Sequence, residues 1–331
     1  MKYNTYTLDN GLRIIHLPSD SKVVYCGYQI NAGTRNEEPG EEGLAHFCEH
    51  VTFKGTERRK AWHILNCLES VGGDLNAYTN KEGTVYYSAI LKEHIARAVD
   101  LLTDIVFHSV YPQAEIDKEV EVICDEIESY NDSPAELIYD EFENIIFKGS
   151  PLGHNILGTA EQVRSFKTED ALRFTRKLYR PDNAIFFAYG DIDFKKLVRL
   201  LQRALADDES VVNLAEEKLP QISQITQISW NENSIAEEKS VSSVKSVGPK
   251  NYPSVGDGIA GQTIVMQKNT HQAHVMIGTR AYDVNDSRRM PLYLLNNMLG
   301  GPGMNAKLNL ALREHNGLVY TVESTMVAYG D

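Results

Sequence analysis

The segment HFCEH, residues 46–50, has one histidine before and one after a glutamate. On a helix, side chains four residues apart lie one turn apart, so the imidazoles of His46 and His50 can converge on one tetrahedral metal ion. Glu49 lies beside them but one step round the helix, where its carboxylate reaches a metal-bound water more easily than the metal itself. This pattern predicts a metal centre that activates water.

The helix that carries these three residues must also pack on the rest of the protein. On a helical wheel with about 100° per residue, the side opposite His46, Glu49 and His50 is apolar. The apolar residues are Leu44, Phe47, Cys48 and Val51. We expect this side to pack on a sheet. A helix with two solvated histidines is the alternative, and the clustering of the polar residues on one side disfavours it.

A third metal ligand must come from another element, and the segment QAEIDKEVEVICDEIESY from Gln113 offers candidates. Its apolar stripe at helical spacing consists of Ile116, Val120, Ile123 and Ile127. Glu119 and Glu126 are seven residues apart, so both lie on one shoulder of this stripe. A carboxylate in that position suits a partly buried metal ion, although a solvated charged face is the common alternative.

Two other segments suggest sites that we consider weaker. His271 and His274 form a second histidine pair, but a spacing of three on a strand puts their side chains on opposite faces. The glycine-rich segment LGGPGMNAK lacks both the G-K-[ST] ending and the G-x-G-x-x-G spacing of phosphate-binding loops. We therefore expect neither a metal ion at the first nor a nucleotide at the second.

Strands and helices follow one another in blocks, which favours an α+β fold with an antiparallel sheet flanked by helices. The turn Asp9-Asn10-Gly11 predicts a hairpin within residues 6–17. Further strands are expected at residues 23–33, 74–80, 83–91 and 183–192. Helices are expected from about residue 42, then at 61–71, 92–108, 113–130, 135–147 and 168–179, with another ending near residue 206.

Composition divides the chain into three parts. Residues 1–210 hold the metal-binding candidates, and residues 211–261 are rich in Ser, Glu, Lys, Asn, Pro and Gly, as in a linker or mobile segment. Residues 262–331 are expected to begin a second domain, with a strand pair at 263–282 and a helix at about 290–299. Because so few residues remain for a domain, we expect this second part to be incomplete.

The net charge of −13 argues against nucleic acid and against an anionic membrane as the main partner. The N-terminal segment MKYNTYTLDNG has no apolar stretch typical of a signal peptide. The four cysteines show no C-x-x-C spacing and are interpreted as free thiols. These features predict a cytoplasmic protein.

The segment GLAHFCEHVTFKGT resembles the inverted zinc motif of the pitrilysin and mitochondrial-processing-peptidase-like metallopeptidases. This resemblance implies that His46, His50 and Glu126 bind Zn²⁺ and that Glu49 is the general base. It also implies that Glu119 acts next to the ligands, by orienting one of them or by replacing Glu126. The implied fold has two homologous halves, of which this chain would contain one and the start of the other.

Two further segments resemble the same family. VGGDLNAYTNKEGTVYY is similar to its edge-strand segment, which implies that Asn76 and Ala77 bind an extended peptide by strand addition. LGGPGMNAKLNLALREHNGLVYTVES is similar to a segment of the second half that supplies an arginine and a tyrosine to the active site, here Arg313 and Tyr320. The family segment usually has serines after the glycines, and this sequence has GGPGMNAK instead.

The resemblance implies a zinc metalloendopeptidase that hydrolyses extended or unfolded peptides through a water activated by Zn²⁺. A non-catalytic subunit of a two-subunit processing peptidase is the alternative, and the intact set of His46, Glu49, His50 and Glu126 disfavours it. A small-molecule lyase with the same inverted motif is a third class, which the chain length disfavours. The family likeness also implies a homodimer or a heterodimer with a related subunit.

Overall fold

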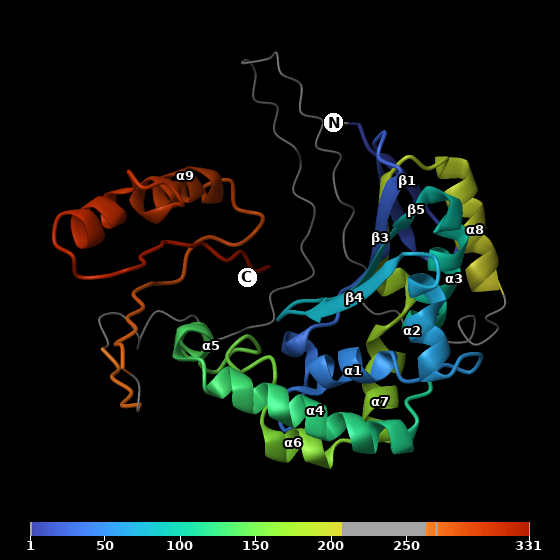
Figure 1. Ribbon diagram of the computed structural model, residues 1–331, viewed down its shortest axis with the longest axis horizontal. Helices are drawn as coiled ribbons and strands as arrows, with labels where there is room; N and C mark the ends of the chain where they lie inside the picture. The colour runs from blue at the N-terminus through green and yellow to red at the C-terminus, as the bar shows by residue number, and fades with distance from the viewer. Residues whose placement is uncertain (1, 207–262, 269–270, 331) are drawn as a thin grey trace. The chain divides into compact units, whose positions relative to one another are not determined.

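The computed structural model describes residues 2–206, 263–268 and 271–330 (Figure 1). By their contacts, the residues divide into two compact units, Met1–Val275 and Met276–Asp331. The predicted linker at residues 211–261 lies outside the described residues. None of the helices in the described part of the chain is long and apolar enough to cross a bilayer.

A six-stranded sheet forms the centre of the first unit, in the spatial order β1-β2-β6-β3-β5-β4 (Figure 1). The strands are β1 Asn4–Thr7, β2 Arg13–Pro18, β3 Val23–Ile30, β4 Asp74–Thr79, β5 Thr84–Leu91 and β6 Ala184–Gly190. Neighbouring strands are antiparallel except for β2 and β6, which are parallel. The predicted α+β class is confirmed, with one parallel pair in a sheet that is otherwise antiparallel as expected.

The predicted hairpin at Asp9-Asn10-Gly11 joins β1 to β2, where Thr7 lies opposite Arg13. Gly11 has φ +87°, and its amide donates to the carbonyl of Leu8 at 2.9 Å. Residues with a side chain rarely adopt this left-handed conformation, so glycine allows the turn.

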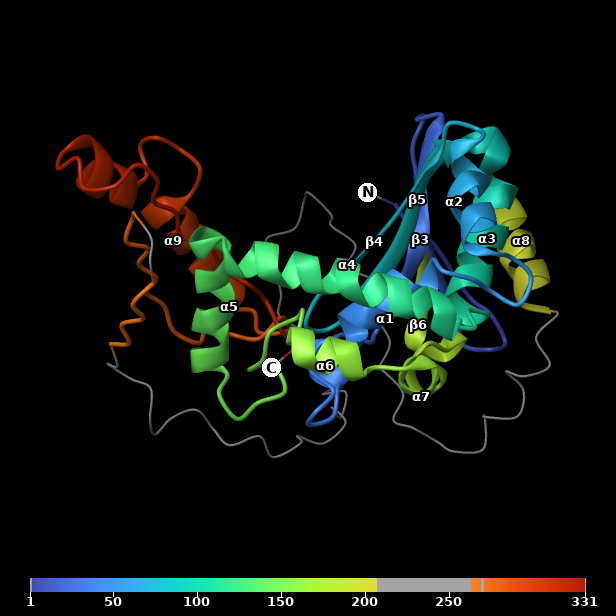
Figure 2. The ribbon, with the colours of Figure 1, turned by 60° about the horizontal axis from the view of Figure 1, so that its bottom comes forward.

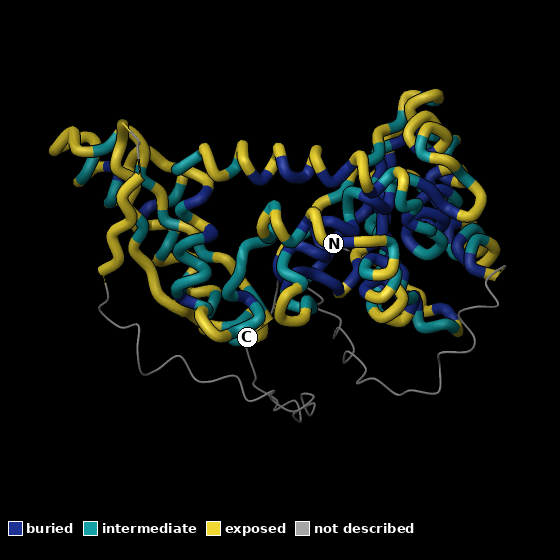
Figure 3. Tube along the Cα trace, turned by 90° about the horizontal axis from the view of Figure 1, so that it is seen from below, coloured by how far each residue is buried: buried dark blue, intermediate teal, exposed yellow. Residues whose placement is uncertain are grey.

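Helices cover the sheet of the first unit, with α3 and α8 packed together and α3 in contact with β3 and β5 (Figure 2). The helices of this unit are α1 Leu44–Thr52, α2 Ala61–Glu69, α3 Ile95–Phe107, α4 Gln113–Asn131, α5 Pro134–Ile146, α6 Ala160–Ser165, α7 Thr168–Leu178 and α8 Phe194–Ala206. The helix α6, which has six residues, was not predicted from the sequence. Buried residues form one core that joins the sheet to these helices except α5, whose buried residues Leu137 and Ile146 lie outside it (Figure 3).

The second unit contains the predicted helix, α9 Arg289–Gly300, followed by a π-helical turn at Asn309–Glu314. The predicted strand pair at residues 263–282 is wrong for the residues described there, which form neither strand. Their apolar side chains are largely exposed, as in Val265 and Ile277 (80% and 93%). A segment with apolar residues forms a strand only when a neighbouring strand supplies hydrogen bonds and a buried face.

Candidate metal centre

The helix α1 begins at a buried carboxylate that the sequence analysis did not identify. Glu37 accepts hydrogen bonds from the backbone amides of Gly43 (3.1 Å) and Ala45 (2.8 Å), and His154 lies 2.8 Å from its Oε2. A carboxylate at a helix N-terminus satisfies amides that have no partner within the helix and interacts favourably with the helix dipole. Glu37 thus fixes where the helix with both histidines starts.

The first turn of α1 also depends on Gly43, which offers a matched test. Gly43 and Gly40 both have φ +95°, but an added Cβ would lie 2.6 Å from the carbonyl oxygen of Leu157 at Gly43 and would meet no atom within 4 Å at Gly40. We expect Gly40→Ala to cost about 1 kcal/mol of unfolding free energy, from backbone strain alone. Gly43→Ala should cost about 2 kcal/mol more. Urea unfolding of both variants measures the difference, and equal losses would contradict the clash.

The apolar side of α1, formed by Leu44, Phe47, Cys48 and Val51, is fully buried, as predicted. The opposite side is not solvated. The side chain of His46 is only 9% exposed and that of His50 21%, because α4 lies over this side of the helix. The alternative of two solvated histidines is therefore wrong.

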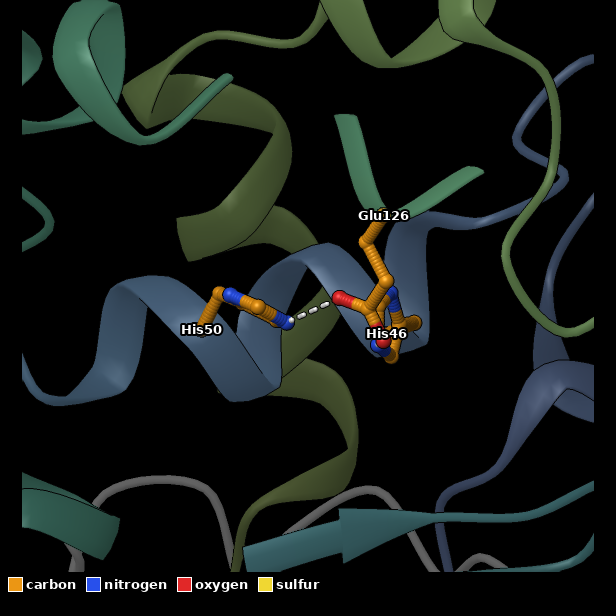
Figure 4. Close-up of side chains that lie close together, drawn as sticks. All are labelled: His46, His50 and Glu126. Carbon is orange, nitrogen blue, oxygen red and sulfur yellow. Dashed lines mark ion pairs between the residues drawn. The ribbon is translucent and has the colours of Figure 1, made fainter. Parts of the chain in front are cut away.

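Three potential ligands from two helices meet at one point. His46 and His50 extend from α1, and Glu126 reaches them from α4 (Figure 4). Nε2 of His50 lies 3.2 Å from Oε2 of Glu126, and Nε2 of His46 lies 3.8 Å from Oε1 of the same carboxylate. One ligand atom from each residue lies within 4.8 Å of the others. The structure thus brings together the three residues that the sequence suggested as ligands.

These distances fit a tetrahedral ion. Ligand atoms at about 2.1 Å from Zn²⁺ are separated by about 3.4 Å along the edge of a tetrahedron, and the two imidazoles lie 3.2 and 3.8 Å from the two different oxygens of Glu126. His46 also keeps its Nδ1 buried without a hydrogen-bond partner among the described residues. Two imidazoles and one carboxylate are ligands that suit Zn²⁺ and leave a fourth position for water.

The two imidazoles have opposite pKa shifts for identifiable reasons. Burial and the neighbouring His50 lower the pKa of His46 to about 4. Burial also acts to lower the pKa of His50, but hydrogen bonds with Glu119 and Glu126 outweigh it and raise the value to about 9. Since Glu126 hydrogen-bonds to His50, its own pKa is lowered. The pair therefore offers one neutral imidazole and one that hydrogen-bonds to carboxylates on both sides.

Glu119 lies on the far side of His50 from Glu126. Its Oε1 lies 3.1 Å from Nδ1 of His50, and its Oε2 lies 2.5 Å from Nζ of Lys54. Only 12% of its side chain is exposed, so the interpretation as a solvated surface glutamate is wrong. A carboxylate at Nδ1 holds the proton there and leaves Nε2 of a metal-binding histidine free. Lys54 was not among the residues predicted from the sequence. The only indication of it there is a basic residue shortly after the helix that carries the histidines.

Glu49 is half-buried beside the cluster, and its buried Oε2 has no hydrogen-bond partner among the residues that the structure describes. Burial raises the pKa of this carboxyl, while hydrogen bonding with Thr79 at the end of β4 lowers it. A buried carboxylate oxygen without a partner is costly for stability and is typical of a functional site.

The two residues predicted to bind peptide lie on β4, which pairs with β5 and forms one edge of the sheet. Asn76 is exposed, and its Oδ1 accepts a hydrogen bond from the amide of Ala77 at 2.9 Å. Ala77 is partly buried against the core. Because α1 also contacts β4, this edge runs beside the helix that carries the histidines.

Arg313 and Tyr320 belong to the second unit, where the structure places them next to each other. The guanidinium carbon of Arg313 lies 5.6 Å from the ring centroid of Tyr320, and Tyr320 is 86% exposed. Both line a pocket of about 550 Å³ together with the glycine-rich turn at Gly300, Gly301 and Gly303. The pocket thus combines the two residues with the segment that resembled the family's second half.

The second histidine pair, His271 and His274, does not form a metal cluster with other described residues. His46, His50 and Glu126 are the group of potential ligands found in the described part of the chain. His271 and His274 lie in an exposed segment without regular structure.

Two family models match the chain in succession. The model described as "Insulinase (Peptidase family M16)" matches residues 14–160, which include every residue of the metal cluster. The model described as "Peptidase M16 inactive domain" matches residues 165–331.

Relatives and solved structures agree with this match. An uncharacterized zinc protease of Rickettsia bellii is 33% identical over 99% of this chain and 71% of its own length. The beta subunit of the mitochondrial-processing peptidase of Saccharomyces cerevisiae is 37% identical over 60% of this chain and 43% of its own length. A protease from Helicobacter pylori, 21% identical, shares the fold with a TM-score of 0.76 over all of this chain and 72% of its own. The chain therefore belongs to the insulinase family, peptidase family M16.

Proposed function

We propose that this chain is a zinc-dependent endopeptidase that hydrolyses peptide bonds in extended or unfolded peptides. The observation that carries the proposal is the meeting of His46, His50 and Glu126 within 4.8 Å, beside the buried carboxylate oxygen of Glu49. A scaffold protein has no need for a buried, unpaired carboxylate oxygen next to two imidazoles. The zinc-protease name of the Rickettsia bellii relative supports the choice of metal.

His46, His50 and Glu126 would hold Zn²⁺, which when bound polarises a carbonyl group and makes water more acidic. Glu49 would accept the proton of the attacking water and deliver it to the leaving amine. Its burial suits this role because a raised pKa brings a carboxyl group closer to the pH at which it must exchange protons. Glu119 would keep the proton of His50 on Nδ1.

The peptide would bind in an extended conformation along β4, the edge strand that ends at Thr79 beside Glu49. An edge strand offers backbone groups to an added strand, and Asn76 and Ala77 lie in the middle of it. A folded protein cannot supply a free strand, so unfolded or short peptides should be preferred. We assign Arg313 and Tyr320 to holding the substrate backbone or the developing oxyanion.

A non-catalytic subunit of a two-subunit processing peptidase is the second candidate function. It is favoured by the word "inactive" in the description of the second family model. The complete set of candidate residues around His46 and His50 favours the peptidase instead. A dimeric state, a cytoplasmic location and the three-part division at residues 210 and 261 stay predictions.

Removal of the metal tests the proposed function directly. The chain loaded with zinc should cleave a quenched-fluorescence peptide of random sequence. A chelator should abolish this cleavage, and added Zn²⁺ should then restore it. A disulfide-stabilised folded protein serves as the control that should resist cleavage. Full zinc content without any turnover would contradict the peptidase and support the non-catalytic subunit.

A further inference from the structure

Lys54, which follows α1 closely, extends toward α4 and contacts Glu119 there. Its Nζ lies 2.5 Å from Oε2 of Glu119. About 25% of the lysine side chain and 12% of the glutamate side chain are exposed, so solvent screens the pair less than it screens a surface ion pair.

We propose that Lys54 is a positioning residue that reserves Glu119 for His50 and thereby leaves Glu126 as the carboxylate that faces both imidazoles. This inference rests on the proposed zinc centre and extends it, because it says which residue decides between two equivalent carboxylates.

The two glutamates are chemically equivalent and lie seven residues apart on the same side of α4. Both contact His50, but at opposite nitrogens. Glu119 lies 3.1 Å from Nδ1, and Glu126 lies 3.2 Å from Nε2. The ion pairs of Glu126 are made to His46 and His50, whereas Glu119 shares its charge between His50 and Lys54. The ion pair with the lysine is thus a contact that Glu119 makes and for which Glu126 has no counterpart among its ion pairs with the described residues.

With both oxygens occupied, the carboxylate of Glu119 has a fixed orientation. One oxygen binds the ammonium group of Lys54 and the other faces Nδ1 of His50. Without the lysine, Oε2 would be free, and the carboxylate could turn toward a bound metal ion or lose its hold on the imidazole. In either case the ligand set would change, because the partners of a metal-binding histidine fix its orientation and its tautomer.

The position of Lys54 is built into the fold rather than set by a mobile surface side chain. Its backbone amide donates to the carbonyl of Val51 at 3.1 Å, which continues the turn that ends α1. The residues that follow are held by Asp104 of α3, a fully buried carboxylate. It accepts hydrogen bonds from Thr56 Oγ1 (2.8 Å) and Arg58 Nε (3.0 Å). The segment after α1 therefore has a fixed direction, and Lys54 has a fixed origin.

Zinc affinity measured by chelator competition tests the inference, together with the visible spectrum of the chain loaded with Co²⁺. We expect Lys54→Met to weaken zinc binding about 10- to 100-fold, as is typical when an outer partner of a metal ligand is lost. The cobalt spectrum should change as well, because its intensity depends on coordination number. Lys54→Arg, which keeps a cation near Glu119, should restore both properties toward those of the unchanged chain.

Lys118→Met is the matched control. It removes the same charge from the residue next to Glu119, but Lys118 pairs with Glu115 and its side chain is 70% exposed. It should leave the zinc affinity and the cobalt spectrum unchanged. If Lys54→Met binds zinc as tightly as Lys118→Met and gives the same spectrum, the inference is wrong.

If Lys54→Met alone unfolds the chain, Glu119→Gln is compared with the double variant Glu119→Gln/Lys54→Met; if it folds, the four chains form a double-mutant cycle. If Lys54 acts through Glu119, its replacement should have no further effect on zinc affinity once the carboxylate is gone. Additive losses would overturn the inference. An unchanged chain that takes up no zinc would contradict the proposed function itself, whereas uptake of zinc without any effect of Lys54→Met would contradict this inference alone.

Discussion

Replacement of Glu49 by glutamine should lower peptide hydrolysis about 100- to 10,000-fold, the usual contribution of a general base. Glutamine has nearly the same shape but cannot take a proton from water. Zinc content should stay at the level of the unchanged chain, because Glu49 is not among the three residues that meet within 4.8 Å. Steady-state hydrolysis of a quenched peptide and metal analysis of the same samples measure both effects.

Glu121→Gln is a suitable control for this experiment. Glu121 lies on the exposed side of α4, where it pairs with Arg164, and its replacement should leave hydrolysis unchanged. Cleavage by Glu49→Gln at the rate of the unchanged chain would show that another group acts as the base. Loss of zinc from Glu49→Gln would instead show that the glutamate is a ligand.

Replacement of Glu126 by glutamine should weaken zinc binding by more than about 100-fold. That value is the upper end of the loss expected when a residue that only hydrogen-bonds a metal ligand is replaced. The reason is that its carboxylate faces both imidazoles, at 3.2 and 3.8 Å, and an amide oxygen carries no charge to offset that of the ion. Titration of the zinc-loaded chain with a competing chelator measures the change. Activity should fall in parallel, since the metal leaves.

Glu119→Gln is the matched comparison, because it makes the same substitution seven residues earlier on the same side of α4. Since Glu119 contacts Nδ1 of His50 rather than the space between the imidazoles, we expect a smaller loss of about 10- to 100-fold. A larger loss for Glu119→Gln than for Glu126→Gln would reverse the roles of the two glutamates. If the unchanged chain, Glu126→Gln and Glu119→Gln all bound zinc with equal affinity, the assignment of a metal centre to these residues would be wrong.

Much of the candidate site was predictable because helical periodicity is a local property. The spacing of His46, Glu49 and His50 places them on one side of α1, whatever surrounds the helix. The stripe on α4 likewise put Glu119 and Glu126 on the same shoulder before any contact was known. The contact between the two helices was not predictable from periodicity, and the family resemblance supplied the choice of Glu126.

The residues that end the first unit and begin the second unit show where local patterns fail. Residues 263–282 were predicted to form a strand pair, yet the described residues there are largely exposed and form no strand. A strand takes its hydrogen bonds from a neighbour, whereas a helix makes its own within a few residues. The helix at Arg289–Gly300 was accordingly predicted correctly in the second unit.

The sequence by itself determined the type of each ligand, the helices that carry them and the side of each helix on which they lie. Only the tertiary structure decided that α4 covers the polar side of α1, that Glu119 and Glu126 approach opposite nitrogens of His50, and that Lys54 holds the first of them. Periodicity is set by backbone geometry within a few residues. The nitrogen of His50 that each carboxylate reaches depends on how two helices distant in sequence pack, which is set by the whole core.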